Sequence, residues 1–473
     1  MNRKTVAPLR HERTMLLIVF LSGLISALNT GLLYIAYMTL AETFHTDLNT
    51  VQWLTAIFSL TSAMVTPTAS YFAKRYSLRN MLMLAFVILM TASIGCALAP
   101  NIQTLIAYRA VQGIASGIMQ PLSMTIIYQW IPKEKQGMFL SISLMGMSLG
   151  PAIGPTLSGF FLTVFDWHAI FICNVPVALL NLALVYGVIP KEARQNADPV
   201  DIRSILTVFA GTLLILLGVY EAGSIGWMHL SIWLAIFCGM ALLTFFVHKQ
   251  LRAERPFLDF HTFRIRRFTI SVIVSAILYA NVTLIAFLMP IFLENAQGMA
   301  PLRAGTLLFV PAICMALATP IAGRTYAKTS ARTQLLWGLG AMLVGTCLIT
   351  TFDETTAPLV LILMLSVRYI GAAFANVPSL DFGLGALPKE KASDGTAMNN
   401  WIKSMAISIS LTIFTTIYSL REGQFLAEHP QSSPAAAAVS VHSDLFWLQG
   451  ATLLFALLLV FFTAERERSS NSR

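Results

Sequence analysis

Residues 146–159 read GMSLGPAIGPTLSG. Small residues recur in this stretch every four positions, at Gly146, Gly150, Gly154 and Ser158. On a helix they would share one face and let another helix approach closely. Pro151 and Pro155 each remove a backbone donor and favour a bend, and Gly159 continues the run of small residues. The stretch therefore predicts a closely packed helix that acts either as a hinge between moving parts or as a passive packing surface, and the two prolines favour the hinge.

The composition around this stretch is that of a membrane protein. Of 473 residues, 56% are hydrophobic and only 11% are charged, against about 25% charged in ordinary soluble domains. A soluble fold of this composition would expose large apolar patches. The net charge of +9 comes from short basic clusters between apolar runs, which argues against a nucleic-acid-binding protein. The five cysteines show no CxxC spacing, so neither a disulfide framework nor a zinc site is indicated.

The apolar runs are long enough to cross a bilayer, which requires about 20 residues in a helix. We predict fourteen spans, with ends uncertain by about two to four residues. They are 14–39, 51–72, 79–99, 103–131, 136–163, 167–189, 203–221, 229–248, 268–293, 302–323, 332–352, 357–387, 394–419 and 443–463. The longest loop in this assignment is 420–442.

Basic residues fix the predicted orientation, because cytoplasmic loops carry the excess of Lys and Arg. With the N-terminus inside, 26 of the 31 Lys and Arg residues fall on the inner side, and only Arg303 and Arg421 fall on the outer side. Both termini are therefore expected in the cytoplasm. The first span follows a basic segment and lacks an A-x-A cleavage site, so we expect it to be retained rather than removed as a signal peptide.

An internal repeat relates the two halves of the chain. Thr66-Pro67-x-Ala69 matches Thr319-Pro320-x-Ala322 at an offset of 253, and Arg109 matches Arg368 at an offset of 259. We predict an all-α membrane fold of two six-helix bundles with two inserted central helices. The corresponding segments are 1–190, 191–260 and 261–473. Duplicated transporters bind substrate where such halves meet.

Three basic residues lie inside predicted spans, namely Arg109, Arg368 and Lys403. A charge at the centre of a membrane helix costs at least about 2.5–3.5 kcal/mol, so these side chains should face the protein interior. Arg109 is either a structural residue that binds neighbouring carbonyls or part of the coupling machinery. Lys403 has the same two interpretations, because its stem is long enough for the ammonium to reach the cytoplasmic surface.

Carboxylates are scarce within the spans. Asp381 lies inside a predicted span, and Glu221 lies at the outer end of another. Either could carry a proton if burial raised its pKa, although Asp381 could instead pair with Lys389 or Lys391. No histidine is predicted deep in a span. Walker, HExxH and GxSxG motifs are missing in suitable context, so we expect neither an ATP-driven pump nor an enzyme, and no cofactor or metal.

The motifs resemble those of one family, the fourteen-span drug:proton antiporters of the major facilitator superfamily. Gly150-Pro151-Ala-Ile-Gly154-Pro155 with Gly159 is similar to its antiporter motif, and Arg109-x-x-Gln112-Gly113 to its span 4 arginine motif. Further matches include Asn174-Val-Pro176, Phe257-Leu-Asp259 and the run from Met289 to Gly298. The resemblance covers nearly the whole chain.

The chain departs from the family pattern at three places. Asn29 stands where the family has a span 1 Asp implicated in proton coupling, and an amide cannot titrate. Ser70 and Lys74 replace a Gly and an Asp in the loop after span 2. Lys403 replaces an Arg in span 13, which keeps the charge but loses the planar fork.

The resemblance implies a multidrug efflux transporter in the bacterial plasma membrane. We expect export of amphipathic, cationic or neutral organic compounds in exchange for protons, with substrate, protons and lipid as partners and a periplasmic adaptor protein as a further one to test. The expected proton-coupling residues are Arg109, Asp381, Glu221, Arg368 and Lys403; the substrate-binding residues Asn29, Tyr34, Gln112, Gln120, Asn399 and Trp401; and the gating-loop residues Lys74, Arg75 and Arg79. The alternatives are a facilitator or exchanger without proton coupling, which Asn29 favours, and a membrane sensor or scaffold, which the lack of a predicted extramembrane domain disfavours.

Overall fold

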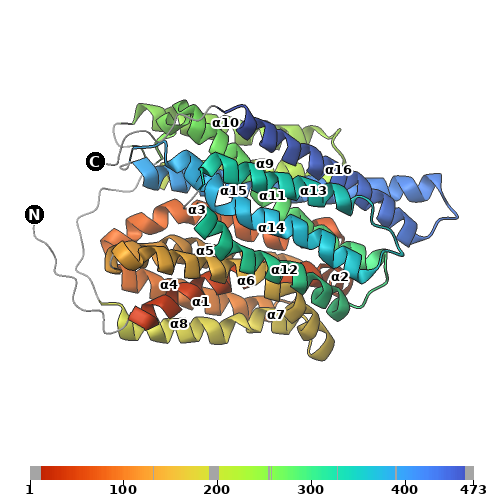
Figure 1. The fold of residues 1–473 in the computed structure, drawn as a ribbon, viewed down its shortest axis with the longest axis horizontal. Coiled ribbons are helices and arrows are strands. Elements are labelled where there is room, and N and C mark those ends of the chain that lie inside the picture. Colours follow the sequence, from red (N-terminus) through yellow and green to blue (C-terminus); the bar gives the residue numbers. More distant parts are fainter. Residues whose placement is uncertain are drawn as a thin grey trace, which may run out of the picture.

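The computed structural model describes residues 12–131, 133–190, 202–253, 256, 258–326, 329–388 and 391–463. Within these ranges the chain forms sixteen α-helices, one short 3-10 helix and no strand, which confirms the all-α prediction. The helices lie roughly along one direction in an elongated bundle (Figure 1). Their bounds are α1 Glu12–Gly31, α2 Leu33–Thr43, α3 Leu48–Tyr76, α4 Leu78–Ala97, α5 Ile102–Trp130, α6 Lys133–Val164, α7 His168–Ile172, α8 Asn174–Val188, α9 Ile202–Ile225, α10 Leu230–Arg252, η1 Phe260–Arg264, α11 Arg266–Asn295, α12 Pro301–Tyr326, α13 Ala331–Ile349, α14 Pro358–Leu384, α15 Ala392–Glu428 and α16 Pro434–Phe461.

Many of these helices can cross a membrane. In the described part of the chain, ten segments are long and apolar enough by length and composition. Two pairs of helices are almost continuous, because only Leu32 separates α1 from α2 and only Cys173 separates α7 from α8. The chain is therefore a multi-pass membrane protein, and the number of fourteen crossings stays a prediction.

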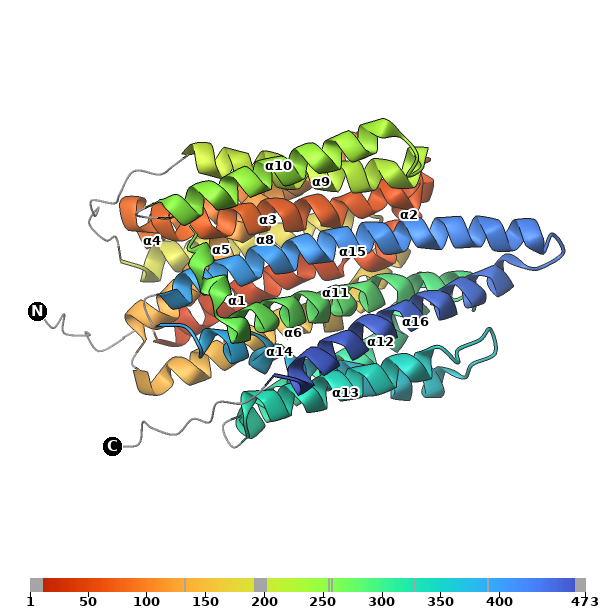
Figure 2. The same ribbon diagram turned by 90° about the horizontal axis from the view of Figure 1, so that it is seen from above.

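The two ends of the bundle differ in which parts of the chain they hold. Helix α1 begins and helix α16 ends at the same end, which we call the near end (Figure 2). The opposite end, the far end, holds the connections at 44–47, 296–300, 350–357 and 429–433.

The helices pack in the same order in two sets. In the first set, α1–α8, α3 packs on α5, α1 on α6, and α4 on both α5 and α8. In the second set, α11–α16, α12 packs on α14, α11 on α15, and α13 on both α14 and α16. The two sets meet where α6 packs on α12 and α3 on α15. The sequence repeat thus corresponds to a repeated packing order.

The apolar core is shared at one end of the bundle and divided at the other. Near the far end, one core joins side chains of both sets, including Leu33, Leu54, Leu288 and Leu411. Toward the near end, one core holds only first-set residues such as Leu82 and Ile126, and another holds only second-set residues such as Leu339, as far as the described residues go. The two sets are therefore joined at the far end and have separate cores at the near end.

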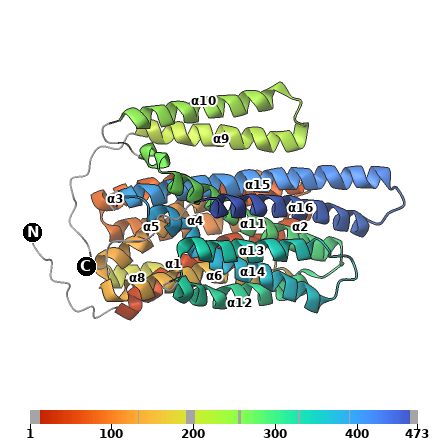
Figure 3. The ribbon, with the colours of Figure 1, turned by 45° about the horizontal axis from the view of Figure 1, so that its top comes forward.

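Helices α9 and α10 form a pair at one edge of the bundle (Figure 3). They pack on each other where Gly211 faces Gly239 and Gly218 faces Ile232, and at these places an added Cβ would come within about 3 Å of the neighbouring helix. At the near end, Val208 and Phe246 of the pair join a small core with Met398 of α15. The pair lies in the segment for which the sequence predicts two inserted helices, and the insertion itself stays a prediction.

Two sequence expectations were wrong at the far end. The predicted loop 420–442 is mostly helical, because α15 continues to Glu428 and α16 begins at Pro434. Ser433 caps α16 by accepting a hydrogen bond from the Ala436 amide, and Pro434 occupies the first turn, where a missing donor is harmless. The earlier start places His442 inside α16 and buries it, so a histidine does lie within a helix of the bundle.

Candidate functional site

Arg109 lies on α5 and is completely buried. Its Nε donates to the Leu54 carbonyl of α3 at 2.8 Å, and its Nη1 donates to the Gln112 side chain at 2.8 Å and to Asn29 of α1 at 3.4 Å. The guanidinium also lies 4.5 Å from the centre of the Phe58 ring, a favourable cation–π distance. These contacts replace the water that a charged group needs.

The polar contacts continue from Arg109 to two further helices. Gln112 donates to Ser93 of α4 at 2.9 Å, and Asn174 of α8 donates to Asn29 Oδ1 at 3.1 Å. All five side chains of this Arg109 network are buried. The network joins α1, α3, α4, α5 and α8, and its described members hold a single charge, that of Arg109.

Arg368 has a corresponding environment on α14. It is buried, donates to the Asn281 carbonyl of α11 at 2.9 Å and to Gln449 of α16 at 2.8 Å, and also donates to Thr346 of α13. Thr346 follows Ser93 by 253 positions, and Asn281 follows Asn29 by 252. Each set therefore has a buried arginine in a polar network. The helices that Arg368 bonds, α11, α13 and α16, correspond to α1, α4 and α8, which belong to the Arg109 network.

Lys403 differs from both arginines. It lies on α15, and its Nζ is 4.2 Å from the centre of the Tyr279 ring of α11. The Tyr279 hydroxyl donates to Asn376 of α14. Asn399 lies one turn before Lys403 and is 3% exposed, and its Oδ1 has no hydrogen-bond partner among the described residues. Trp401 faces away from this group and packs edge-on against Phe260.

The small residues of the GMSLGPAIGPTLSG stretch form the contact between α6 and α1. A Cβ on Gly146 would lie 2.6 Å from the Phe20 carbonyl oxygen, one on Gly150 would overlap Ala27, and one on Gly154 would lie 2.7 Å from the Gly31 carbonyl carbon. Helix α6 runs through Pro151 and Pro155 without interruption. The packing role is thus visible, and the hinge role stays a prediction.

The remaining predicted residues lie apart from these networks. Glu221 is exposed at the far end of α9, and Arg79 at the near end stacks on the Tyr186 ring at 4.6 Å. The side chains of Tyr34, Gln120, Asp381, Lys74, Arg75, Pro151 and Pro155 lie outside those that the structure describes, although their backbones are helical.

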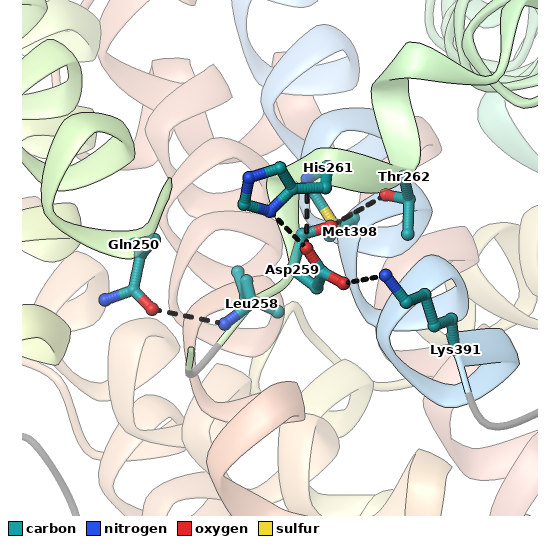
Figure 4. Close-up of polar contacts among 7 residues, drawn as sticks. All are labelled: Gln250, Leu258, Asp259, His261, Thr262, Lys391 and Met398. Atoms are coloured by element: carbon teal, nitrogen blue, oxygen red, sulfur yellow. Dashed lines mark hydrogen bonds and ion pairs between the residues drawn. The ribbon is translucent and has the colours of Figure 1, made fainter. Parts of the chain in front are cut away.

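A polar cluster at the near end ties the α9–α10 pair to α15 (Figure 4). Lys391, which caps α15, donates to Asp259 Oδ2 at 2.7 Å, and the His261 amide donates to Oδ1 at 3.0 Å. Gln250 of α10 accepts from the Leu258 amide at 3.4 Å and donates to Ser204 of α9 at 3.0 Å.

The surroundings of the Asp259 carboxyl shift its pKa. Its burial raises the pKa, but the hydrogen bonds from Lys391 and His261 outweigh that effect, so the pKa lies below its ordinary value. The sequence had suggested Lys391 as a partner of Asp381, and the described contact is with Asp259 instead.

The comparison with known proteins identifies the family. The profile described as Major Facilitator Superfamily matches residues 19–411. The chain belongs to the major facilitator superfamily. This confirms the resemblance seen in the motifs and makes the protein a transporter rather than an enzyme. The fold is similar to that of a solved structure of the xylose transporter XylE from E. coli, with a TM-score of 0.66 and 16% sequence identity. The superposition covers 97% of this chain and 99% of that one.

Relatives of this superfamily member carry different names. The uncharacterized MFS-type transporter YhcA of Bacillus subtilis is 31% identical over 86% of this chain and 76% of its own length. The lincomycin resistance protein LmrB of Listeria monocytogenes is 27% identical over 90% of each chain. The riboflavin transporter RibZ of Clostridioides difficile is 26% identical over 98% of this chain and 100% of its own. Drug-resistance proteins are thus among the relatives of this transporter.

Sequence reasoning missed several members of the two arginine networks. Ser93, Thr346, Asn281 and Gln449 were not singled out, because each is an unremarkable polar residue in an apolar run. The repeat held the signal, since shifting Ser93 and Asn29 by about 253 positions leads to Thr346 and Asn281. Tyr279 and Asn376, which surround Lys403, have no such counterpart to reveal them.

Proposed function

We propose that the protein exports amphipathic organic compounds across the bacterial plasma membrane by alternating access, in exchange for protons. The observation that carries this proposal is the division of the core. One apolar core joins the two sets at the far end, whereas toward the near end the large core of the first set and that of the second set are separate in the described residues. Two helix sets that are joined at the far end can rock against each other, so that the far end opens while the near end closes.

The substrate class is supported by the relatives and by aromatic side chains where the two sets meet. LmrB is named for lincomycin resistance, and RibZ for riboflavin transport. Lincomycin and riboflavin are therefore the first compounds to test on this chain. Aromatic contacts between the sets, such as Tyr37 against Phe287 at 5.3 Å, suit ligands with apolar faces.

The near end is proposed to face the cytoplasm, with both termini inside and fourteen crossings, in which α1–α2 and α7–α8 are each one interrupted span. The described near-end side chains include many basic residues, whereas the far end has Arg303 and Arg421. A cysteine replacing Ala435, in the first turn of α16, should react with an impermeant maleimide in intact cells. Labelling that needs permeabilised cells would contradict the orientation.

Proton coupling needs a group that titrates, and the Arg109 network has an amide, Asn29, where the family has a carboxylate. We propose Asp381 as the proton carrier and Glu221 as the second candidate. The second candidate function, a facilitator or exchanger without proton coupling, is favoured by Asn29 and by the exposure of Glu221.

The deciding experiment reconstitutes the purified protein in proteoliposomes with an internal pH dye. Lincomycin, riboflavin and ethidium are each added with and without a pH gradient. Antiport predicts proton movement that depends on substrate and uphill substrate accumulation that depends on the gradient. Asp381→Asn should keep downhill exchange and lose the dependence on the gradient. Accumulation by the unmutated protein that ignores the gradient would establish the facilitator instead.

A further inference from the structure

The three cations inside the bundle differ in how many hydrogen bonds they make. Arg109 and Arg368 each donate several hydrogen bonds to carbonyl and amide oxygens. The Lys403 ammonium lies over the face of the Tyr279 ring. Among the described residues it makes no hydrogen bond and no ion pair. An ammonium has three donors, so the Lys403 side chain retains most of its capacity to bind.

The surroundings of Lys403 place further polar groups beside it. Three helices meet here, because Tyr279 belongs to α11, Asn376 to α14 and Lys403 to α15. Residues four apart share a helix face, so Asn399 lies on the same side of α15 as Lys403. The Asn399 side chain is more than nine-tenths buried, and no described residue bonds its Oδ1. Among the described residues, the group therefore combines a half-buried cation and a buried amide oxygen, neither of which has a hydrogen-bond partner.

The distribution of charge along the bundle indicates what this group would bind. The described carboxylates lie at helix ends, in loops or in the far-end stretches of α15 and α16. The described charges in the middle of the bundle are all positive, namely Arg109, Arg368 and Lys403. A charge at a helix centre is costly, and a cation–π contact offsets only part of that cost. A bound anion would offset the rest of the cost of placing the Lys403 charge inside the bundle.

We propose that Lys403 and Asn399 form an anion-binding subsite that holds the carboxylate of an amphipathic substrate. This inference rests on the proposed export function and refines its substrate class, which becomes amphipathic carboxylates rather than cationic or neutral compounds. The ammonium donates to the carboxylate, Tyr279 holds the lysine stem in place, and Asn399 Oδ1 accepts from an N–H group next to the carboxylate. An N-substituted amino acid has both groups in that arrangement.

The test uses three dansyl probes of different charge, of which the first two share one carbon skeleton. Dansyl-leucine is a carboxylate with an adjacent sulfonamide N–H, its methyl ester is neutral, and dansylcadaverine is a cation. Binding to the purified protein in detergent is followed by dansyl fluorescence. The variants are Lys403→Met and Lys403→Arg, with Lys249→Met in the last turn of α10 as a control that removes a positive charge elsewhere.

We expect dansyl-leucine to bind about 10- to 100-fold more tightly than its ester, as for a hydrogen bond to a charged group. Lys403→Met should abolish this difference and leave the ester's affinity within about twofold, which also shows that the variant is folded. Lys403→Arg and Lys249→Met should keep the difference. Should Lys403→Met fail to fold, Lys403→Gln replaces it in the same comparison.

Several outcomes would overturn the subsite. These are equal affinity for acid and ester, no binding of the acid, or an unchanged preference in Lys403→Met. Loss of gradient-driven transport in Lys403→Met with intact acid binding would make the lysine a proton-coupling residue instead. Transport of the same probes in proteoliposomes is measured separately. If dansyl-leucine binds as expected but none of the probes is transported, the proposed export function is wrong and the proposed subsite is still supported.

Discussion

The contact of α1 with α6 and the contact of α11 with α15 occupy the same place in the two sets, yet they are built differently. In the first, glycines of α6 lie directly on the α1 backbone, and a Cβ on Gly150 would overlap Ala27. In the second, Lys403 of α15 lies on the ring of Tyr279 of α11. Ala27 precedes Asn29 by two residues, and Tyr279 precedes Asn281 by two, so the two contacts correspond.

The difference shows how a duplicated scaffold can serve two purposes. Close backbone contact leaves no side chain to interact with a ligand, but it gives a smooth surface along which one helix can shift against another. The lysine and tyrosine instead place polar groups at the contact of α11 with α15. We therefore assign movement to the first contact and ligand binding to the second, and the predictions below test this division.

The largest effect is expected from filling the α1–α6 contact. Gly150→Leu places a large side chain where a Cβ already overlaps Ala27, and overpacking of this kind costs about 1–3 kcal/mol or more. Transport in proteoliposomes should fall at least about tenfold. Gly187→Leu on α8 is the matched control, because nothing lies within 4 Å of the Cβ position there. Wild-type transport by both Gly150→Leu and Gly154→Leu would mean that this contact is ordinary packing.

Removing the arginine from either network should destabilise the protein, and for Arg109 we also expect an effect on transport. Arg109→Ala and Arg368→Ala each leave buried acceptors without a donor, which costs about 2–4 kcal/mol and should lower the unfolding temperature in both variants. Arg109→Ala should also abolish transport, and Arg109→Lys should recover part of it because the charge is kept. Equal loss of transport and folding in Arg109→Ala and Arg109→Lys would assign Arg109 a purely structural role.

A smaller effect is expected at the start of α15, where Lys391 binds Asp259. The folded-state pKa of Asp259 is lowered, so the carboxylate stabilises the protein above its usual pKa, and this contribution is lost as the pH falls through the lowered value. Asp259→Asn should lower the unfolding temperature by about 2 °C at pH 7, and the difference should shrink below about pH 4. A difference that is the same at pH 7 and pH 3 would contradict the ionic role.

The smallest structural effect is expected from Asn29→Asp, which restores the carboxylate typical of the family. Asn29 accepts from Arg109 and Asn174 through Oδ1, while no described residue bonds its Nδ2, so an aspartate keeps every described hydrogen bond. The unfolding temperature should change by less than about 2 °C, whereas the dependence of transport on pH should increase. An unchanged pH profile would show that position 29 does not influence proton coupling in this protein.

The sequence predicted most of the helices and the duplication, because apolar runs of about 20 residues and repeated Thr-Pro motifs are local signals. It failed at the far end of α15 and α16. The segment 420–433 contains charged and polar residues such as Arg421 and Glu428, which ended the apolar run but did not end the helix. Hydropathy reports where lipid contact stops, whereas helical propensity and the cap at Ser433 decide where helices stop.

The candidate site was predictable only in part. Charge in an apolar run singled out Arg109, Arg368 and Lys403, since the cost of burying a cation makes such residues rare. Their partners were out of reach, because Asn29 and Arg109 are separated by 80 residues and Asn281 contacts Arg368 across 87. Tyr279 looks like any aromatic residue of a membrane helix until the fold places it under Lys403.

The shared apolar core at the far end gives the transporter a sensitivity to temperature. Opening this end would expose side chains such as Leu33 and Leu288 to water. The free energy that opposes such exposure decreases on cooling, because hydrophobic stabilisation near room temperature is mainly entropic. Cold should therefore shift the population toward molecules that are open at the far end, and warmth should favour the closed arrangement seen here.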